Sequence, residues 1–256
     1  MKNNNNENNQ IETNNEVIND ELNKNSKKKE KKDKKEKKHK NISYSQEILR
    51  KGIHLLSLSI PIVYVFVDKG FAMTVLLLMA ITAVLLDVLS KRIPFFNNLI
   101  YGNFGSMLRK HERKKKKFVL NGASWVLISA VITVFIFPKI IAVTAFIILI
   151  VCDIAAALIG RKWGRHKLFN KSWEGTSAFI ISGFIVVAIV GTVFNAPFGF
   201  FVAGVLASII SGFVEAMSKK LKIDDNLSIP ISFGIVMWVV EYYFSLFNQP
   251  FLDLIK

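Results

Sequence analysis

Residues 140–159 read IIAVTAFIILIVCDIAAALI, and this stretch decides the fold class. Its only charged residue is Asp153. An α-helix rises about 1.5 Å per residue, so a helix of this length can cross the hydrocarbon core of a bilayer, which is about 30 Å thick. The stretch therefore predicts a transmembrane helix that carries an acidic residue within the membrane.

The same pattern recurs along the chain. Further apolar runs occupy residues 53–67, 71–90, 118–137, 177–194, 197–214 and 229–247. The first run is the shortest, and its helix is expected to begin near Gln46, which places Arg50 and Lys51 in the interfacial layer. The sequence thus predicts an all-α, multi-pass transmembrane helix bundle of about seven spans.

Residues 1–41 have the opposite character. They contain no aromatic residue, consist largely of Asn, Lys and Glu, and end in a lysine-rich stretch. Such a segment cannot bury enough apolar surface to offset the entropy of ordering, so we expect a disordered tail. Its charges fit contacts with anionic lipid headgroups, whereas nucleic-acid binding is not expected without an aromatic or Gly-rich module. Residues 42–256 are expected to form an integral membrane domain, which the motifs below make the candidate catalytic domain.

The basic residues predict the orientation in the membrane. With the amino-terminal tail inside, 31 of the 34 Lys and Arg residues fall on one side. Because basic residues that flank spans are retained in the cytoplasm, this side is expected to be cytoplasmic. An odd number of spans then places the carboxyl terminus outside or in the lumen.

Asp153 is the most informative residue for function. An uncompensated acid at mid-bilayer costs about 2.5 kcal/mol or more, and such residues normally face a bundle interior and serve function. The alternative is a buried ion pair that fixes helix packing. Helical spacing also places small residues on the same face as Asp153, where they would admit another backbone or a ligand. These residues are Ala156, Ala157, Gly160 and Gly164.

A basic loop follows this span and runs into KSWEG at the start of the next one. Its cations are Arg161, Lys162, Arg165, His166, Lys167 and Lys171. Cations beside the unpaired N–H groups of a helix amino terminus form an anion site, although retention of flanking charge would also explain them. The stretch from Gly160 to Lys167 is not a P-loop, because that motif needs four residues between its first Gly and a Gly-Lys-Ser/Thr.

Two further segments are expected on the same membrane face. EILRKGIH places Glu47, Arg50 and His54 on one helical face, with Lys51 adjacent, where they would contribute to a site; a snorkelling interfacial belt is the alternative. EAMSKKLKIDDNLSIP carries oxygen ligands that suit Mg²⁺. These are Glu215, Asp224, Asp225 and Asn226. Weaker candidates are Asp87 and Glu112, for which interfacial solvation is expected, Asn121, and Glu241, for which a structural role is expected.

Four segments, taken in order, resemble the CTP-dependent lipid kinases, a family that includes dolichol kinase, phytol kinase and a diacylglycerol kinase. They are EILRKGIH, GSMLRKHERKKKKFVLNGASWVL, CDIAAALIGRKWGRHKLFNKSWEGTSAF and GFVEAMSKKLKIDDNLSIPI. The resemblance covers about residues 45–247. Its most specific part is D-x6-G followed by the basic loop and K-S-x-E-G.

The resemblance implies phosphoryl transfer from CTP, or another nucleoside triphosphate, to the hydroxyl of a membrane lipid alcohol. Arg50, Lys51, Asp153 and Gly160 match the positions that this family requires for activity. Nucleotide and phosphate binding would fall to His54, Arg161, Lys162, Gly164, Lys167, Lys171, Ser172 and Gly175. Mg²⁺ would be held by Asp153, Glu174 and Asp225, but a metal ligand and a general base both suit Asp153.

Two other functions stay open from the residues. A cytidylyltransferase that makes a CDP-activated lipid would also use CTP, Mg²⁺ and acidic residues at span ends. A transporter could use Asp153, Glu241 and Asp87 as a proton or cation relay.

Overall fold

The computed structural model describes residues 44–93, 95, 120–247 and 250–252. The tail expected over residues 1–41 and the candidate Glu112 lie outside the described residues. The helices are α2 (Tyr44–Leu56), α3 (Ser59–Phe66), α4 (Lys69–Arg92), α6 (Gly122–Ile136), α7 (Lys139–Trp163), α8 (Trp173–Val193), α9 (Phe198–Leu221) and α10 (Asp225–Ser245). One antiparallel hairpin, β1 (Lys167–Leu168) with β2 (Lys171–Ser172), joins α7 to α8.

The predicted all-α membrane bundle is confirmed, because each apolar run corresponds to an apolar helical segment. Among the described residues, six segments are long and apolar enough to cross a membrane, and α6 is a shorter apolar helix of 15 residues. The first span is broken between α2 and α3. Pro61 explains the break, since proline has no N–H to donate to the preceding turn.

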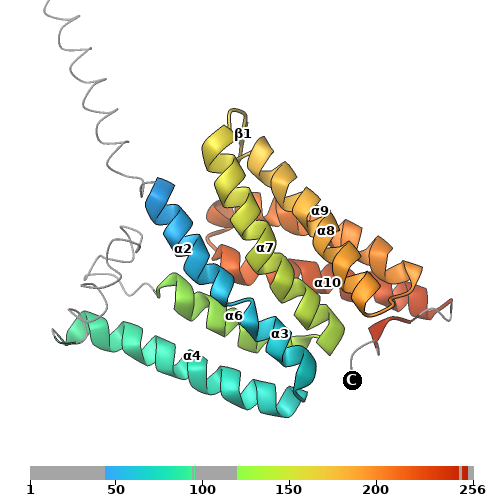
Figure 1. Ribbon diagram of the computed structural model, residues 1–256, viewed down its shortest axis with the longest axis horizontal. Coiled ribbons are helices and arrows are strands. Elements are labelled where there is room, and N and C mark those ends of the chain that lie inside the picture. Colours follow the sequence, from blue (N-terminus) through green and yellow to red (C-terminus); the bar gives the residue numbers. More distant parts are fainter. Residues whose placement is uncertain (1–43, 94, 96–119, 248–249, 253–256) are drawn as a thin grey trace, which may run out of the picture. The chain divides into compact units, whose positions relative to one another are not determined.

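Helix α7 is the centre of the bundle. Of the most apolar 18-residue segment of α7, 72% is buried inside the protein, whereas the corresponding share for α4 is 22%. It contacts α2, α3, α6, α8 and α10, and Figure 1 shows it between α2 with α3 on one side and α8 on the other. The stretch that decides the fold class is therefore also the bundle's core helix.

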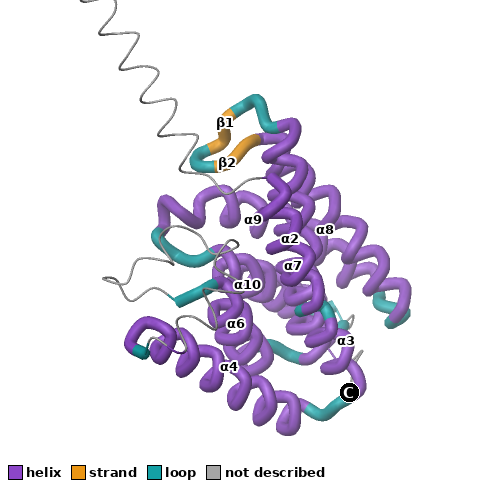
Figure 2. Tube along the Cα trace, turned by 60° about the vertical axis from the view of Figure 1, so that its left-hand side comes forward, coloured by secondary structure: helices purple, strands orange, loops and turns teal. Residues whose placement is uncertain are grey.

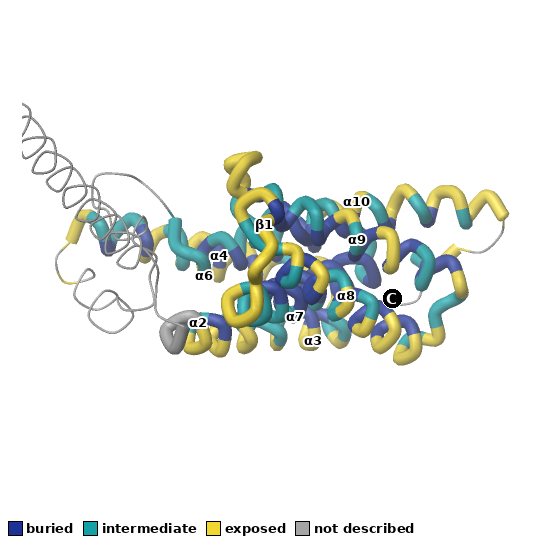
Figure 3. Tube along the Cα trace, turned by 90° about the horizontal axis from the view of Figure 1, so that it is seen from above, coloured by how far each residue is buried: buried dark blue, intermediate teal, exposed yellow. Residues whose placement is uncertain are grey.

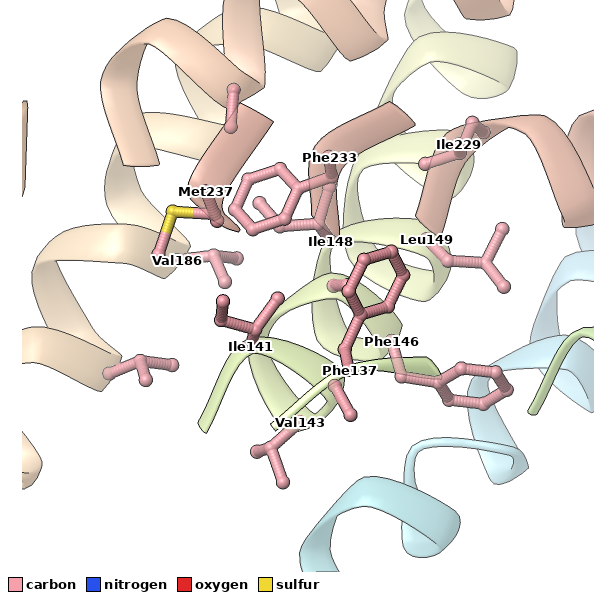
Figure 4. Close-up of a cluster of buried hydrophobic side chains, with 14 of the residues drawn as sticks. Phe137, Ile141, Val143, Phe146, Ile148, Leu149, Val186, Ile229, Phe233 and Met237 are labelled. Carbon is pink, nitrogen blue, oxygen red and sulfur yellow. The ribbon is translucent and has the colours of Figure 1, made fainter. Parts of the chain in front are cut away.

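Large apolar side chains fill the space between α7 and its neighbours. Figure 4 shows Phe137 and Ile141 facing Phe233 and Met237, which come from α10. A Cβ at Gly234 would lie 2.5 Å from the Phe137 ring, so glycine makes room for that ring. The helix surfaces that face outward are also apolar, as Ile181, Ile185 and Ile189 of α8 are all exposed (Figure 3). An apolar core with an apolar exterior is the pattern of a protein in lipid.

Helices α7 and α8 approach each other closely through small residues. A Cβ at Gly175 would lie 3.0 Å from the Ala156 carbonyl oxygen and 3.2 Å from Gly160 Cα. Of the two expectations for the small-residue face of α7, another backbone or a ligand, the structure shows a backbone at Gly160, where a Cβ would lie 3.3 Å from Gly175 Cα. Gly160 is a packing residue of this crossing.

We expect Gly175→Ala to lower the free energy of unfolding by about 1–3 kcal/mol, because the backbone atoms that the new methyl group meets cannot rotate away. Gly52→Ala is the matched control, since nothing lies within 4 Å of a Cβ at that helical position. It should raise stability by up to about 1 kcal/mol through helix propensity. Unfolding of both variants in detergent micelles measures the difference, and equal stabilities would contradict the close crossing.

Asp87 connects the end of α4 to the start of α6. It is 4% exposed and accepts hydrogen bonds from Asn121 N at 2.9 Å, from Asn121 Nδ2, and from Ser124 Oγ at 2.7 Å. Asn121 in turn caps α6 through Ser124 N. The expectation of interfacial solvation for Asp87 is therefore wrong, because its carboxylate is buried and fully used in a helix junction.

We expect Asp87→Ala to cost about 3 kcal/mol of stability, because three donors would lose their buried acceptor. Asp68→Ala is the comparison, since Asp68 caps α4 through two backbone N–H groups but is exposed. That change should cost about 1 kcal/mol. Chemical denaturation of the two variants provides the measurement, and a smaller loss for Asp87→Ala than for Asp68→Ala would contradict the assigned junction.

Candidate active site

The buried acid Asp153 meets a cation from α2. Lys51 Nζ donates a hydrogen bond to Asp153 Oδ2, and both residues are 5% exposed. His54, one helical turn beyond Lys51, places Nε2 3.9 Å from the same oxygen. The structure therefore confirms that the RKGIH segment and the acid of α7 lie together, and it gives Asp153 the buried ion pair that was the alternative to a free functional acid.

A second charged group lies around Lys171 in β2. Lys171 Nζ donates to Glu215 Oε1 of α9 and lies 3.7 Å from Asp225 Oδ2 at the start of α10. Burial disfavours the charge on Lys171, but the carboxylates of Glu215 and Asp225 outweigh it, so the pKa of Lys171 is raised above its ordinary value. Lys171 is therefore a cation at every physiological pH.

The two groups are neighbours, because a Cβ at Gly160, two turns after Asp153 on α7, would lie 3.2 Å from Oγ of Ser172, the residue after Lys171. The charges of Asp153 and Lys171 also attract each other, so we treat the two groups as one site. We call the whole set the charged cluster: Lys51, His54, Asp153, Lys171, Glu215 and Asp225. It draws residues from α2, α7, β2, α9 and α10, at the end of the bundle where the hairpin lies (Figure 2). Segments separated by more than 100 residues thus converge on one place, which agrees with the expectation that they lie on the same membrane face.

The basic loop is shaped by Glu174. Its Oε1 accepts hydrogen bonds from Arg165 N at 3.0 Å and His166 N at 3.1 Å, and lies 2.8 Å from His166 Nδ1. The acid of KSWEG is thus the group that folds the loop back onto the start of α8. The loop's cations at positions 161, 162 and 167 are exposed, and Lys162 Nζ lies 4.6 Å from the centre of the Trp163 ring.

Ser172 explains the start of α8. It is the N-cap residue, and its Oγ accepts a hydrogen bond from Gly175 N at 3.2 Å. The same Oγ would lie 2.6 Å from a Cβ at Gly164, so the end of α7, the hairpin and the start of α8 are packed closely. The N–H group of the next residue, Trp173, donates to His166 O at 3.0 Å.

The three acids predicted to hold Mg²⁺ are not brought together as one ligand set. Among the described residues, no group of three or more His, Cys, Asp or Glu side chains could hold a metal ion. Asp153 pairs with Lys51, and Glu174 accepts from the basic loop. Asp225 is the one of the three that pairs with Lys171, at 3.7 Å. A site made of these three carboxylates is therefore not supported.

Glu241 and Asp87, the other two acids of the transporter hypothesis, lie in different parts of the fold from Asp153. The single N–H group of Phe251 is shared between Glu241 Oε1, at 3.0 Å, and Glu241 Oε2, at 3.1 Å, which fits the structural role expected for Glu241. Asp87 belongs to the junction of α4 with α6. Sequence reasoning missed the contact of Glu215 with Lys171, because Glu215 lies just beyond the apolar run of residues 197–214 and resembled a residue at a span end.

The fold and the cluster define a multi-pass helical membrane protein with a buried, charged site at one end of its bundle. Residues 35–220 match the model of the cytidylyltransferase family, so the chain belongs to that family. Its resemblance to CTP-dependent lipid kinases is confirmed by relatives that carry such names.

Three relatives illustrate the range of similarity. The chain is 32% identical to a phytol kinase of Synechocystis, over 35% of this chain and 40% of that protein. It is 27% identical to CTP-dependent diacylglycerol kinase 1 of Schizosaccharomyces pombe, over 60% of this chain and 74% of the relative. An uncharacterized protein of Rickettsia prowazekii is 28% identical over 79% of this chain and 98% of its own length. No solved structure matches the chain.

Proposed function

We propose that this protein transfers the γ-phosphoryl group of CTP to the hydroxyl of a membrane lipid alcohol, of the phytol, dolichol or diacylglycerol type. The observation that carries the proposal is the convergence of Lys51, Asp153 and Lys171 within a membrane bundle. Such charges are expensive in a membrane unless they serve a site. The relatives named as CTP-dependent lipid kinases support the reaction class.

The cations of the site suit a triphosphate. Phosphoryl transfer is catalysed mainly by positioning and by charge stabilisation, for which Lys51 and Lys171 are placed in the cluster and Arg50 next to it. The exposed loop adds cations at positions 161, 162 and 167. At the amino terminus of α8, Trp173 N donates to His166 O and Gly175 N donates to Ser172 Oγ, so the phosphate contacts are assigned to the cations.

Asp153 is proposed to orient the lipid hydroxyl and accept its proton, while it also holds Lys51 in place. An ammonium group already bonded to one carboxylate oxygen makes Asp153 a poorer metal ligand than Asp225. Mg²⁺ is usually bound through one or two carboxylates together with substrate phosphates, so Asp225 fits as the protein's contribution to a Mg²⁺–nucleotide complex. The ion would supply charge neutralisation on the phosphate oxygens.

A site at the end of the bundle suits a substrate that stays in the membrane, because the hydroxyl of such a lipid lies near the headgroup level. We place this end on the cytoplasmic side, with the amino terminus in the cytoplasm and the carboxyl terminus outside or in the lumen. This orientation is proposed because 31 of the 34 Lys and Arg residues fall on the side of the membrane that carries the amino-terminal tail.

A panel of acceptors tests the reaction. Purified protein in lipid vesicles receives γ-labelled CTP or γ-labelled ATP with Mg²⁺, and phytol, a polyprenol or diacylglycerol as acceptor. Label in the lipid extract is expected with CTP for at least one alcohol. An extract without label for every donor and acceptor would refute the proposed kinase activity.

A cytidylyltransferase reaction is the second candidate, because the matching family model carries that description. The two reactions leave different products in solution. A kinase releases CDP, whereas a cytidylyltransferase releases pyrophosphate and needs a phosphorylated lipid as acceptor. Analysis of the soluble products with phosphatidate in place of the alcohol therefore separates them.

A further inference from the structure

Glu215 is the most deeply buried carboxylate of the charged cluster. Its side chain is 1% exposed, compared with 8% for Asp153 and 12% for Asp225. It lies near the end of α9, a helix that packs along both α8 and α10. A charge removed from water to this extent is unfavourable unless an opposite charge is fixed beside it.

Lys171 provides that opposite charge. Its ammonium group donates to Glu215 Oε1, while Glu215 Oε2 is buried and has no hydrogen-bond partner among the described residues. The buried negative charge of Glu215 is therefore compensated by the ammonium group of Lys171. The dependence is mutual, because the charge of Glu215 is the largest of those that favour the charged form of Lys171.

The Lys171 ammonium group is bonded to Glu215, but the Lys171 side chain is still partly accessible to solvent. Of its side chain, 26% is exposed, and it directly precedes Ser172, the N-cap of α8. An ammonium group has three N–H donors. Glu215 takes one of them, and Asp225 lies 3.7 Å away. The geometry leaves donor capacity on the Lys171 ammonium group for an anion.

We infer that Glu215 is a positioning residue that acts through Lys171: it fixes the ammonium group where a phosphate of the nucleotide binds. The inference rests on the proposed function and deepens it, since it separates Glu215 from the metal-binding role that its residue type suggested. A lysine bonded to the carboxylate is a reason against direct metal ligation by Glu215. The reacting atoms are touched by Lys171 and not by Glu215.

Glu215→Gln tests the inference, because it keeps the volume and one acceptor oxygen but removes the charge that holds Lys171. The KM for CTP is expected to rise about tenfold, as for a weakened charge-assisted hydrogen bond, while the KM for the lipid alcohol stays unchanged. Ser211→Ala is the matched control, since Ser211 lies one turn earlier on α9, is buried, and donates to the Ala207 and Ser208 carbonyl oxygens of its own helix. A Glu215→Gln variant with the wild-type KM for CTP would overturn the inference.

The charge swap Glu215→Lys with Lys171→Glu distinguishes positioning from a purely structural pair. The swap restores opposite charges but presents a carboxylate to the phosphate. We expect its thermal unfolding midpoint to exceed that of either single variant, while equilibrium binding of labelled CTP in the presence of Mg²⁺ stays lost. Recovery of CTP binding in the swap would overturn the inference.

The proposed function and this inference can fail separately. Wild-type protein that binds CTP but labels no lipid would refute the kinase reaction and leave the role of Glu215 measurable by binding. Wild-type protein that labels lipid, together with an unaffected Glu215→Gln variant, would refute only the inference.

Discussion

Asp153→Asn is expected to abolish phosphorylation, with a loss of about 10³-fold or more, because the change removes both the proton acceptor and the counter-charge of Lys51. The asparagine side chain has nearly the same volume and keeps an oxygen that can accept from Lys51, so the fold should persist, although stability falls because Lys51 loses its counter-charge. Initial rates of label transfer from γ-labelled CTP to lipid, in vesicles that contain equal amounts of folded protein, measure the effect.

Glu241→Gln is the matched control for this prediction. It also neutralises a buried carboxylate within a span, but Glu241 contacts the backbone of Phe251 and lies outside the charged cluster. Its amide oxygen can still accept from Phe251 N, so activity should stay within about twofold of wild type, as expected for a conservative change away from the site. Comparable losses in both variants would count against a special role for Asp153.

Lys51→Met should lose activity and also a large part of the stability. Removal of one partner leaves the buried charge of Asp153 without its ammonium group, which costs about 3–5 kcal/mol for a buried pair. The double variant Lys51→Met with Asp153→Leu replaces both charges by apolar groups and is expected to regain stability to within about 1 kcal/mol of wild type or better. It should remain inactive.

This cycle separates packing from chemistry. Denaturant titration in micelles gives the free energies of unfolding, and the lipid-labelling rate gives the activity. A stable double variant that retained phosphorylation would show that the Lys51–Asp153 pair serves helix packing alone. A single Lys51→Met variant as stable as wild type would contradict the buried ion pair itself.

The helical segments of the fold could be predicted from the sequence because lipid imposes a simple rule. A span needs about 20 apolar residues with internally satisfied backbone groups, and residues 140–159 meet that rule without reference to any other part of the chain. Local details were less accessible. The break before α3 depends on how Pro61 affects the preceding turn, and the junction at Asp87 depends on a contact with Asn121, 34 positions away.

The candidate site was predicted as a set of residues but not as a set of pairs. Residue type and depth marked Asp153, and the basic loop marked Lys171, because charges near a membrane interior are conspicuous. Which cation meets which acid depends on helix rotation and packing, and these are determined by interactions across the whole bundle. The pairings of Lys51 with Asp153 and of Lys171 with Glu215 therefore required the structure.

The dependence of pairing on packing also explains why the three predicted metal ligands do not lie together in the structure. Asp153, Glu174 and Asp225 are all oxygen ligands in motif segments, so the sequence grouped them. In the structure, Glu174 accepts from the backbone of Arg165 and His166, a role that only the fold of the loop reveals. A carboxylate that shapes a loop has the same residue type as one that binds an ion.

The most direct test of the central claim uses two labels in one preparation. Wild-type protein in vesicles with its preferred lipid alcohol receives either α-labelled or γ-labelled CTP, and the lipid is extracted and counted. Our account predicts that the γ-label enters the lipid, that the α-label stays in solution as CDP, and that Asp153→Asn abolishes the lipid label. Entry of the α-label into lipid, or undiminished γ-label with Asp153→Asn, would contradict it.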